Sequence, residues 1–476
     1  MALGEKTGAA GKGANLRFTA VDLRQVMPFG VFFGVCLFAP RFTDDAYITT
    51  LIYIGINVLL VVGLNLLMGY AGQISLGHAA FFGIGAFTSA ILTRKPMPGE
   101  VIPGFAVGVG VMLGAAVLIA LTRVKGWRLA ACVAAMLVAQ WISNVLGWGV
   151  LGALPLYAAA MAGTGVLTRT GVVKPAVAGV AAALMAMLCN SFLLGVLANA
   201  GTGPWKAMAV GVFFTGLIAY LIGDEVLRLR GHYLAMATLG FGIIVEIVFR
   251  QWTAVTGGSS DGIFDIPSIE YARSLPAPII GVLKWAAGGE LGMKQEYYYL
   301  VWAFVFVALL VSVNIVRSRV GRAFRAVHGS EIAAESLGVD TERYKVQVFV
   351  FSAALASVAG SLHAHNAGIG YVHPSEFSFI VSVLLVVMVV VGGMASVWGS
   401  LFGAGVIQLI KDWLLGIDKA APVVFGVALK GLDPIVFGAV LIIVMMLLPQ
   451  GLVRGLTDAA KAAWARSMRA RAQASE

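Results

Sequence analysis

The chain has 476 residues, of which 59% are hydrophobic and 12% are charged, and its mean hydropathy is +0.91. A soluble protein of this size would need far more polar surface, so the composition excludes a soluble enzyme and predicts an all-α, polytopic integral membrane protein. The formal net charge is +10, but the basic residues form short clusters between apolar runs. That distribution is typical of membrane topology and does not favour a nucleic-acid partner.

Apolar segments recur along the chain with about the length that a helix needs to cross a lipid bilayer, roughly 20 residues. We expect about 12–14 transmembrane segments, including short, broken or re-entrant helices. The expected spans lie near residues 27–40, 47–69, 79–93, 102–122, 127–146, 148–167, 175–197, 204–222, 234–252, 297–316, 346–366, 378–394, 398–416 and 434–448. The interrupted apolar stretch 276–288 is expected at the membrane interface.

The basic residues predict an orientation. With the N-terminus in the cytoplasm, most of the 33 Lys and Arg residues fall in segments on the inner side, and both termini are cytoplasmic. Two longer polar segments remain, 256–296 on the outside and 317–345 on the inside. Neither is large enough to be a catalytic domain.

The stretch GLNLLMGYAGQISLGHAAFFGIGAF, residues 63–87, combines glycines with polar side chains inside an apolar region. Glycine weakens a helix, and a polar side chain in hydrocarbon is costly unless it is satisfied, so the stretch predicts a broken helix. The alternative is that the glycines only allow helices to pack closely. The positions concerned are Asn65, Gly69, Gly72, Gln73, Ser75, Gly77 and His78.

The inner segment contains a short predicted helix. Ser330 is placed to cap it, the segment continues through Glu331, Ala333, Ala334 and Glu335, and Gly338 ends it. A helix this short is marginal in water, so we expect it to be held by another protein or by the ends of the neighbouring spans. The alternative is an ordinary amphipathic loop whose basic residues, among them Arg325, serve topology alone.

Motifs of nucleotide and hydrolytic chemistry are absent from the sequence. There is no P-loop, no GxSxG elbow and no cluster with metal-ligand spacing, and the three cysteines are scattered within apolar runs. We therefore expect no enzyme activity, no metal and no cofactor bound by this chain.

Residues 63–87 closely resemble the signature of permease subunits of the high-affinity branched-chain amino acid ABC transporter family. Further stretches resemble that family in the same order: LRLRGHYLAMATLGFG (227–242), TGGSSDGI (256–263), RAFRAVHGSEIAAESLGV (322–339), VVVGGMASVWGSLFGA (389–404) and LLPQGL (447–452). RLRGHYLAMATL together with TGGSSDGI is similar to the M-type of the two permeases. Ala333, Ala334 and Gly338 match the coupling motif E-A-A-x-x-x-G, with Ile332 where its first Glu would stand.

The resemblance implies a division of the chain into five regions. They are a cytoplasmic segment 1–26, first spans 27–98 with the glycine-rich signature, inserted extra helices 99–203, a permease core 204–455, and a basic cytoplasmic tail 456–476. Within the core, 256–296 is the periplasmic loop and 317–345 the cytoplasmic coupling loop.

The resemblance also implies a function. The chain would be a multi-pass permease of the bacterial inner membrane that carries leucine, isoleucine and valine after delivery by a periplasmic binding protein. It would form a heterodimer with a second, related permease above two ABC ATPase subunits, which hold the ATP and magnesium. The coupling loop would be Arg325, Ser330, Glu331, Ala333, Ala334, Glu335 and Gly338, and the binding-protein dock Gly257, Gly258, Ser259 and Asp261. The broken-helix residues would line the substrate pathway.

Other functions stay open at this point. An ABC permease for another small polar solute, such as urea, a short amide or another amino acid, would carry the same motifs. An ion-coupled secondary transporter would instead need ionisable residues within spans, and Glu246 is the clear example here.

Overall fold

The structure, a computed structural model, describes residues 23–93, 203–229, 231–258, 262–269, 276–366 and 370–420, with isolated positions elsewhere. Its elements are α1 (Leu23–Phe38), η1 (Ala39–Arg41), α2 (Asp45–Asn65), η2 (Leu66–Tyr70), α3 (His78–Thr93), α8 (Pro204–Val226), α9 (His232–Gln251), α10 (Thr253–Thr256), α12 (Ala277–Ala287), α13 (Met293–Arg317), α14 (Arg319–Gly329), α15 (Glu331–Ser336), α16 (Thr341–Ala364), η4 (Pro374–Phe377), α17 (Phe379–Gly392) and α18 (Val397–Ala420). Val423–Val424 (β1) and Val427–Ala428 (β2) form a short antiparallel pair.

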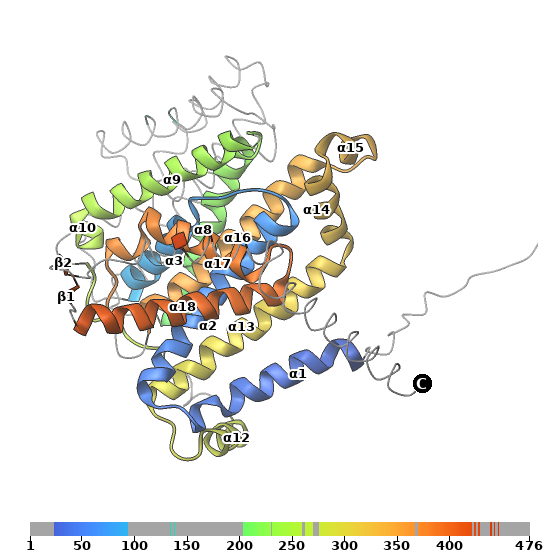
Figure 1. Ribbon diagram of the computed structural model, residues 1–476. Helices are drawn as coiled ribbons and strands as arrows, with labels where there is room; N and C mark the ends of the chain where they lie inside the picture. Colours follow the sequence, from blue (N-terminus) through green and yellow to red (C-terminus); the bar gives the residue numbers. More distant parts are fainter. Residues whose placement is uncertain are drawn as a thin grey trace, which may run out of the picture.

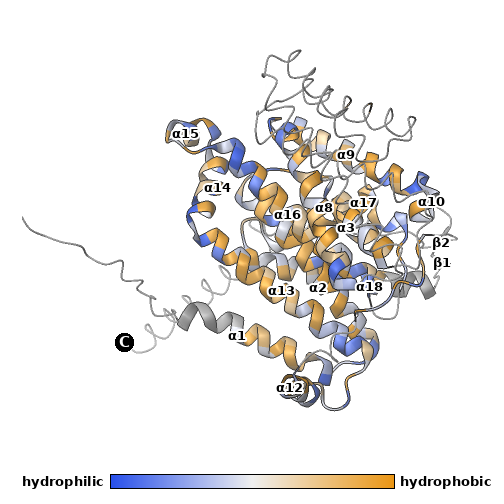
Figure 2. Cartoon of the chain, turned by 180° about the vertical axis from the view of Figure 1, so that it is seen from behind, coloured by the Kyte–Doolittle hydropathy of each residue, from blue (hydrophilic) through white to orange (hydrophobic). Residues whose placement is uncertain are grey.

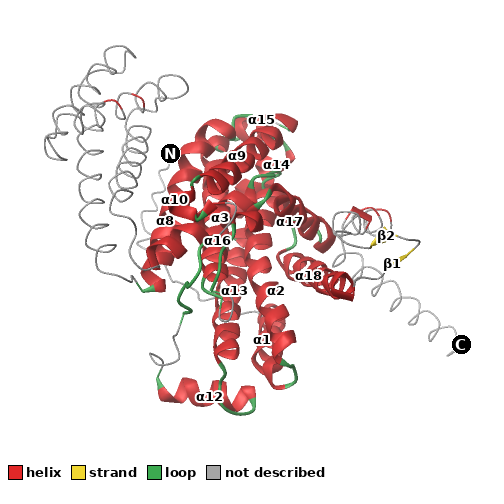
Figure 3. Ribbon diagram, turned by 90° about the vertical axis from the view of Figure 1, so that its left-hand side faces the viewer, coloured by secondary structure: helices red, strands yellow, loops and turns green. Residues whose placement is uncertain are grey.

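The described part is a bundle of apolar helices with two distinct ends (Figure 1). Segment α14–α15 projects at one end and α12 lies across the other, as Figure 3 shows; we call them the α15 end and the α12 end. Five described helices are long and apolar enough to cross a membrane: Asp45–Tyr70, α8, α9, α13 and α16. Apolar residues dominate these helices, and polar residues gather on α14 and α15 (Figure 2). The prediction of an all-α membrane protein is confirmed.

Each expected span in the described part coincides with a helix, while those within 99–203 and the span 434–448 fall outside the described residues. Two boundaries differ from the expected loops. Helix α16 begins at Thr341, inside the expected loop 317–345, because the Asp340 side chain caps it by accepting a 3.1 Å hydrogen bond from Arg343 N. The expected outer loop contains α12 and the first turn of α13.

The core is built around α2, α3 and α16. Helix α16 packs against α2, α3 and α8, and α2 also contacts α13, α17 and α18. Each long helix can be compared over its most apolar window of 18 residues. In the continuous helix Asp45–Tyr70, which joins α2 and η2, 83% of that window is buried, against 17% in α9. Helix α2 is therefore an interior helix, and α9 lies at the rim of the described bundle.

Glycines bring α3 and α16 into backbone contact. A Cβ added at Gly360 would lie 2.7 Å from Ala86 N, and one added at Gly85 would lie 2.5 Å from the Cα of Ser357. Ser361 Oγ donates a hydrogen bond of 3.3 Å to Gly85 O across the same contact. Because lipid tails are as apolar as side chains, van der Waals contact between small residues is the main force that holds such helices together.

Close glycine contacts also form the turn between α17 and α18. A Cβ at Gly399 would lie 2.6 Å from Gly392 O, and one at Gly403 would lie 2.8 Å from Gly392 N. Gly399 and Gly403 therefore form a helix contact after a tight turn.

Gly360→Ala is predicted to destabilise the protein, because the new methyl group has no room against α3, and overpacking of this kind costs about 1–3 kcal/mol. Gly405→Ala in α18 is the matched control, since no atom lies within 4 Å of its added Cβ. The measurement is the thermal unfolding midpoint of the detergent-solubilised protein. Equal midpoints for the two variants would contradict the packing described here.

Candidate functional site

The chain interrupts its helix between α2 and α3. Helix α2 widens into the π-turn η2, and residues 71–77, which we call the helix break, return the chain to the start of α3 at His78. Gly72 has φ +71°, a left-handed conformation that favours glycine. Gln73 N donates to Leu67 O at 3.0 Å, and Leu76 N donates to Thr238 Oγ1 of α9 at 3.1 Å. The predicted broken helix is present.

Asn65 holds the α17–α18 turn against the end of α2. Its Nδ2 donates to Ser396 O at 2.7 Å and to Ser400 Oγ at 2.9 Å, and its Oδ1 accepts from Ala395 N at 3.0 Å. Each polar atom of the Asn65 amide is therefore hydrogen-bonded within the protein. This geometry makes Asn65 a structural residue rather than a free polar group of a pathway.

Three other polar side chains of the break region are buried with free hydrogen-bonding atoms. Gln73, Ser75 and His78 are 4%, 1% and 0% exposed. Both amide atoms of Gln73, the hydroxyl of Ser75 and Nδ1 of His78 have no hydrogen-bond partner among the described residues. His78 Nε2 lies 3.3 Å from Ser352 Oγ of α16. A buried unsatisfied polar atom costs about 1–3 kcal/mol, so this cluster is suited to contact with water or a polar ligand.

The glycines of the region pack against backbone and side chains. A Cβ at Gly69 would lie 3.1 Å from the Cα of Ala395, and one at Gly77 would lie 3.1 Å from the carbonyl carbon of Thr238. The close-packing alternative is therefore correct for Gly69 and Gly77, whereas the role of the polar positions in a pathway stays a prediction.

The inner segment forms two helices, of which the sequence had predicted only the second. Helix α14 is capped by Ser318, whose Oγ accepts from Val320 N at 3.1 Å, and it buries Ala323, Phe324 and Val327 while Arg325 is exposed. Apolar residues three and four apart were the available signal.

Helix α15 has the predicted ends. Ser330 Oγ accepts from Ala333 N at 3.3 Å, and Gly338 follows the helix with φ +82°. Glu331 forms an ion pair with Lys345 of α16, and Thr341 Oγ1 donates to Glu335 Oε1 at 2.7 Å. The predicted helix is therefore tied to the end of a span.

The two alanines of α15 face different ways. Ala334 is 2% exposed and packs inward, whereas Ala333 is exposed. Next to Ala333, Ile332 and Leu337 are 68% and 83% exposed. Helix α15 therefore presents a small apolar surface, made of Ile332, Ala333 and Leu337, at the tip of the α15 end.

The expected docking loop is only partly described. Gly257 and Gly258 adopt φ +75° and +70°, and Ser259 and Asp261 lie outside the described residues. Further along, Ile263 and Val372 exchange backbone hydrogen bonds of 2.9 and 3.0 Å. The loop after α10 is thus joined to the connection between α16 and α17.

A polar cluster at the end of α16 was not predicted. His363 Nε2 lies 2.9 Å from Glu376 Oε2 of η4, and His365 lies 2.8 Å from Ser89 Oγ and 2.6 Å from Pro267 O. Burial raises the pKa of the Glu376 carboxyl, but the hydrogen bond and charge of His363, together with His373, outweigh burial, so this pKa lies below its usual value. These contacts tie η4 to α16 and account for the histidines without a metal.

A second polar contact joins α2 to α18. Thr50 Oγ1 donates to Asp412 Oδ2 at 2.5 Å, Asn57 Nδ2 donates to Gln408 Oε1 at 2.8 Å, and Gln408 Nε2 donates to Asp412 Oδ1 at 2.9 Å. The spacing of Gln408 and Asp412, four residues apart in an apolar run, was a signal that the sequence carried.

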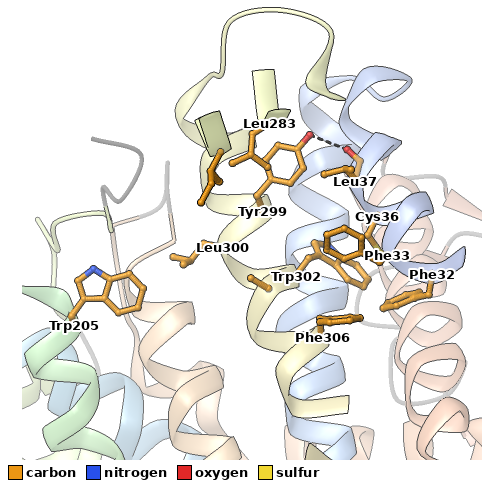
Figure 4. Close-up of a pocket in the computed structure, with 12 residues that line it drawn as sticks. Phe32, Phe33, Cys36, Leu37, Trp205, Leu283, Tyr299, Leu300, Trp302 and Phe306 are labelled. Carbon is orange, nitrogen blue, oxygen red and sulfur yellow. Dashed lines mark hydrogen bonds between the residues drawn. The ribbon is translucent and has the colours of Figure 1, made fainter. Parts of the chain in front are cut away.

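An apolar cavity of about 470 Å³ lies between α1, α12, α13 and the start of α8 (Figure 4). None of its twelve lining residues is charged, and the Tyr299 hydroxyl donates to Leu37 O at 3.0 Å. A zwitterion needs partners for both of its charges, so this cavity does not suit an amino acid.

A central helix broken inside an apolar bundle, with a short capped helix tied to the start of a span, is typical of an integral membrane transport protein. The sequence profile of the family described as "Branched-chain amino acid transport system / permease component" matches residues 46–155 and 159–447, and the chain belongs to this family. The two matched ranges meet inside 99–203, the region predicted to be inserted. No solved structure matches the chain.

Curated relatives carry matching names. The chain is 31% identical over 266 residues to the high-affinity branched-chain amino acid transport system permease protein LivM of Escherichia coli (strain K12), covering 53% of this chain and 58% of that protein. It is also 31% identical over 258 residues to the LivH protein of the same description from Salmonella typhimurium (strain LT2), covering 52% of this chain and 75% of LivH. The chain therefore spans little more than half the length of LivM.

We predict that Asn65→Leu lowers the stability of the protein and that Gln73→Met does not. Loss of the Asn65 amide leaves three partners on the α17–α18 turn without these hydrogen bonds, of which Ser400 is buried and Ala395 and Ser396 are partly buried. The thermal unfolding midpoint falls, because an unsatisfied buried polar group costs about 1–3 kcal/mol. Gln73→Met replaces an amide without partners by an apolar side chain of similar size, so its midpoint is unchanged or higher. A Gln73 variant that loses as much stability as the Asn65 variant would contradict this assignment.

Proposed function

We propose that this chain is the membrane-spanning permease subunit of an ATP-driven ABC importer that carries leucine, isoleucine and valine across the bacterial inner membrane. The observation that carries the proposal is the family match over residues 46–155 and 159–447. It is supported by the names of the relatives, which are permease proteins of high-affinity branched-chain amino acid transport systems.

The same comparisons support a proposal for its partners. LivM and LivH are two permease proteins named for one kind of transport system, and both resemble this chain. We infer an M-type subunit that pairs with a second, related permease. Two ATPase subunits supply the ATP chemistry, and a periplasmic binding protein delivers the amino acid. The chain itself is non-catalytic and binds no cofactor in this scheme.

The α15 end faces the cytoplasm in this proposal, as the distribution of basic residues predicts. The apolar surface of Ile332, Ala333 and Leu337 is then where an ATPase subunit docks. Glu331 and Glu335 contact Lys345 and Thr341 at the start of α16, so a movement of α15 is transmitted directly to that span.

The substrate path is proposed to pass the helix break. Gln73, Ser75 and His78 offer an amide, a hydroxyl and an imidazole atom without partners among the described residues. Donors and acceptors together suit a zwitterion, whose carboxylate and ammonium need opposite kinds of partner. The binding protein is proposed to dock over the opposite end, near Gly257 and Gly258.

The deciding experiment is purification of the tagged chain from its native membranes in mild detergent, followed by mass spectrometry of its partners and leucine uptake by the reconstituted complex. We expect a second permease, two ATPases and uptake that requires both ATP and the binding protein. Transport by the chain alone without ATP would overturn the proposal. ATP-driven uptake of a different polar solute, but not of leucine, would overturn the substrate.

Ile332→Glu and Leu337→Glu are predicted to insert normally but to lose ATPase binding and uptake, because a charge on the exposed apolar surface prevents docking. Met293→Glu is the matched control: Met293 is also an exposed apolar side chain, 58% exposed, at the first residue of α13. The measurements are co-purification of the ATPases and leucine uptake. If the ATPases co-purify in full with both the Ile332 and the Leu337 variant, these residues are not part of the docking surface.

A further inference from the structure

The helix break and the α14–α15 segment touch each other at one point. The imidazole of His328, in the last turn of α14, lies on Gly72 at the tip of the break. A Cβ at Gly72 would lie 3.2 Å from both Cγ and Cε1 of His328, so a larger residue at position 72 would force the exposed ring to move. The backbone at position 72 is left-handed, a conformation that favours glycine. The backbone conformation and the nearby ring therefore both restrict which residue can stand at position 72.

Helix α14 is held firmly at its other end. Ser318 caps it, and a Cβ at Gly321 would lie 2.5 Å from Ile315 O, which fixes a tight turn out of α13. The Phe324 ring meets Tyr344 of α16 edge-on, with centroids 6.2 Å apart. Because α15 follows α14 directly, a movement at α15 is transmitted first to the last turn of α14, which contains His328.

The break is the segment that such a movement would change. Gln73 and Ser75 are buried while their neighbours Gly72 and Ile74 are exposed, so a small rotation of the break exchanges buried and exposed positions. The unsatisfied atoms of Gln73 and Ser75 make the present arrangement costly, and exposure to water would remove that cost. The hydrogen bonds of Gln73 N and Leu76 N and the contact of Gly72 with His328 hold the break in place against that cost.

We propose that His328 is a positioning residue that holds the helix break closed and releases it when α15 moves, so that ATPase docking controls access to Gln73, Ser75 and His78. This inference rests on the proposed function. His328 touches neither substrate nor nucleotide; it acts through its contact with Gly72.

The test uses the complete complex in proteoliposomes, first with the unmodified chain. His328→Ala is expected to keep complex assembly and binding-protein-stimulated ATP hydrolysis, while leucine taken up per ATP falls about fivefold or more, the size of a lost allosteric coupling. His328→Phe keeps a planar ring on Gly72 and is expected to retain most of the coupling. His232→Ala, at an exposed histidine that begins α9, is the matched control and should retain full coupling.

A second readout follows the break itself. Ile74→Cys, in a chain whose Cys36, Cys132 and Cys189 are replaced by serine, is labelled with a membrane-impermeant maleimide with and without a non-hydrolysable ATP analogue. Labelling should depend on nucleotide when His328 is present and become independent of it in His328→Ala.

Several results would overturn the inference. Unchanged uptake per ATP in His328→Ala, or nucleotide-dependent labelling that persists in it, would show that the contact carries no coupling. Loss of ATP hydrolysis together with uptake would assign His328 to docking itself. These outcomes differ from failure of the proposed function, in which the unmodified complex takes up no leucine.

Discussion

Hydrocarbon offers no hydrogen-bond partners, and this constraint decides how the bundle can be interrupted. The chain leaves helical geometry between α2 and α3 and again between α17 and α18. Asn65 connects these two interruptions, because its side-chain amide at the end of α2 forms hydrogen bonds with Ala395, Ser396 and Ser400. The glycine contacts of α3 with α16 then close the bundle around the break.

The polar residues of one short stretch therefore have different tasks. Both polar atoms of the Asn65 side chain are hydrogen-bonded within the protein, whereas neither polar atom of the Gln73 side chain, eight positions later, has a partner among the described residues. Between them, Gly69 packs on the α17–α18 turn and Gly72 lies under His328. The broken helix of this chain thus joins a hydrogen-bonded anchor to a segment whose polar side chains lack partners among the described residues, which is the combination that the proposed gate requires.

Hydropathy was sufficient to predict the described spans, because the length of an apolar run is a local property. The capping residues Ser330 and Gly338 likewise predicted α15, since caps act within a few residues of the helix they end. Helix α14 was missed because its charges read as topology signals. Side-chain partners could not be predicted at all: Asn65 bonds to a residue 335 positions away, and no local pattern distinguishes it from Gln73. The contact between His328 and Gly72 depends on the same long-range folding.

The α2–α18 contact has a consequence for biogenesis. Thr50 and Asp412 are 362 residues apart, so α2 enters the membrane long before the helix that satisfies its polar face has been translated. During that interval Thr50, Asn57 and Asn65 lack their native partners in an otherwise apolar segment. The polar side chains of α2 must therefore stay shielded from lipid, at the insertion machinery or against other early helices, until α18 is inserted and completes the bundle. A ribosome that stalls before α18 therefore leaves α2 as an apolar helix whose three polar side chains lack their native partners.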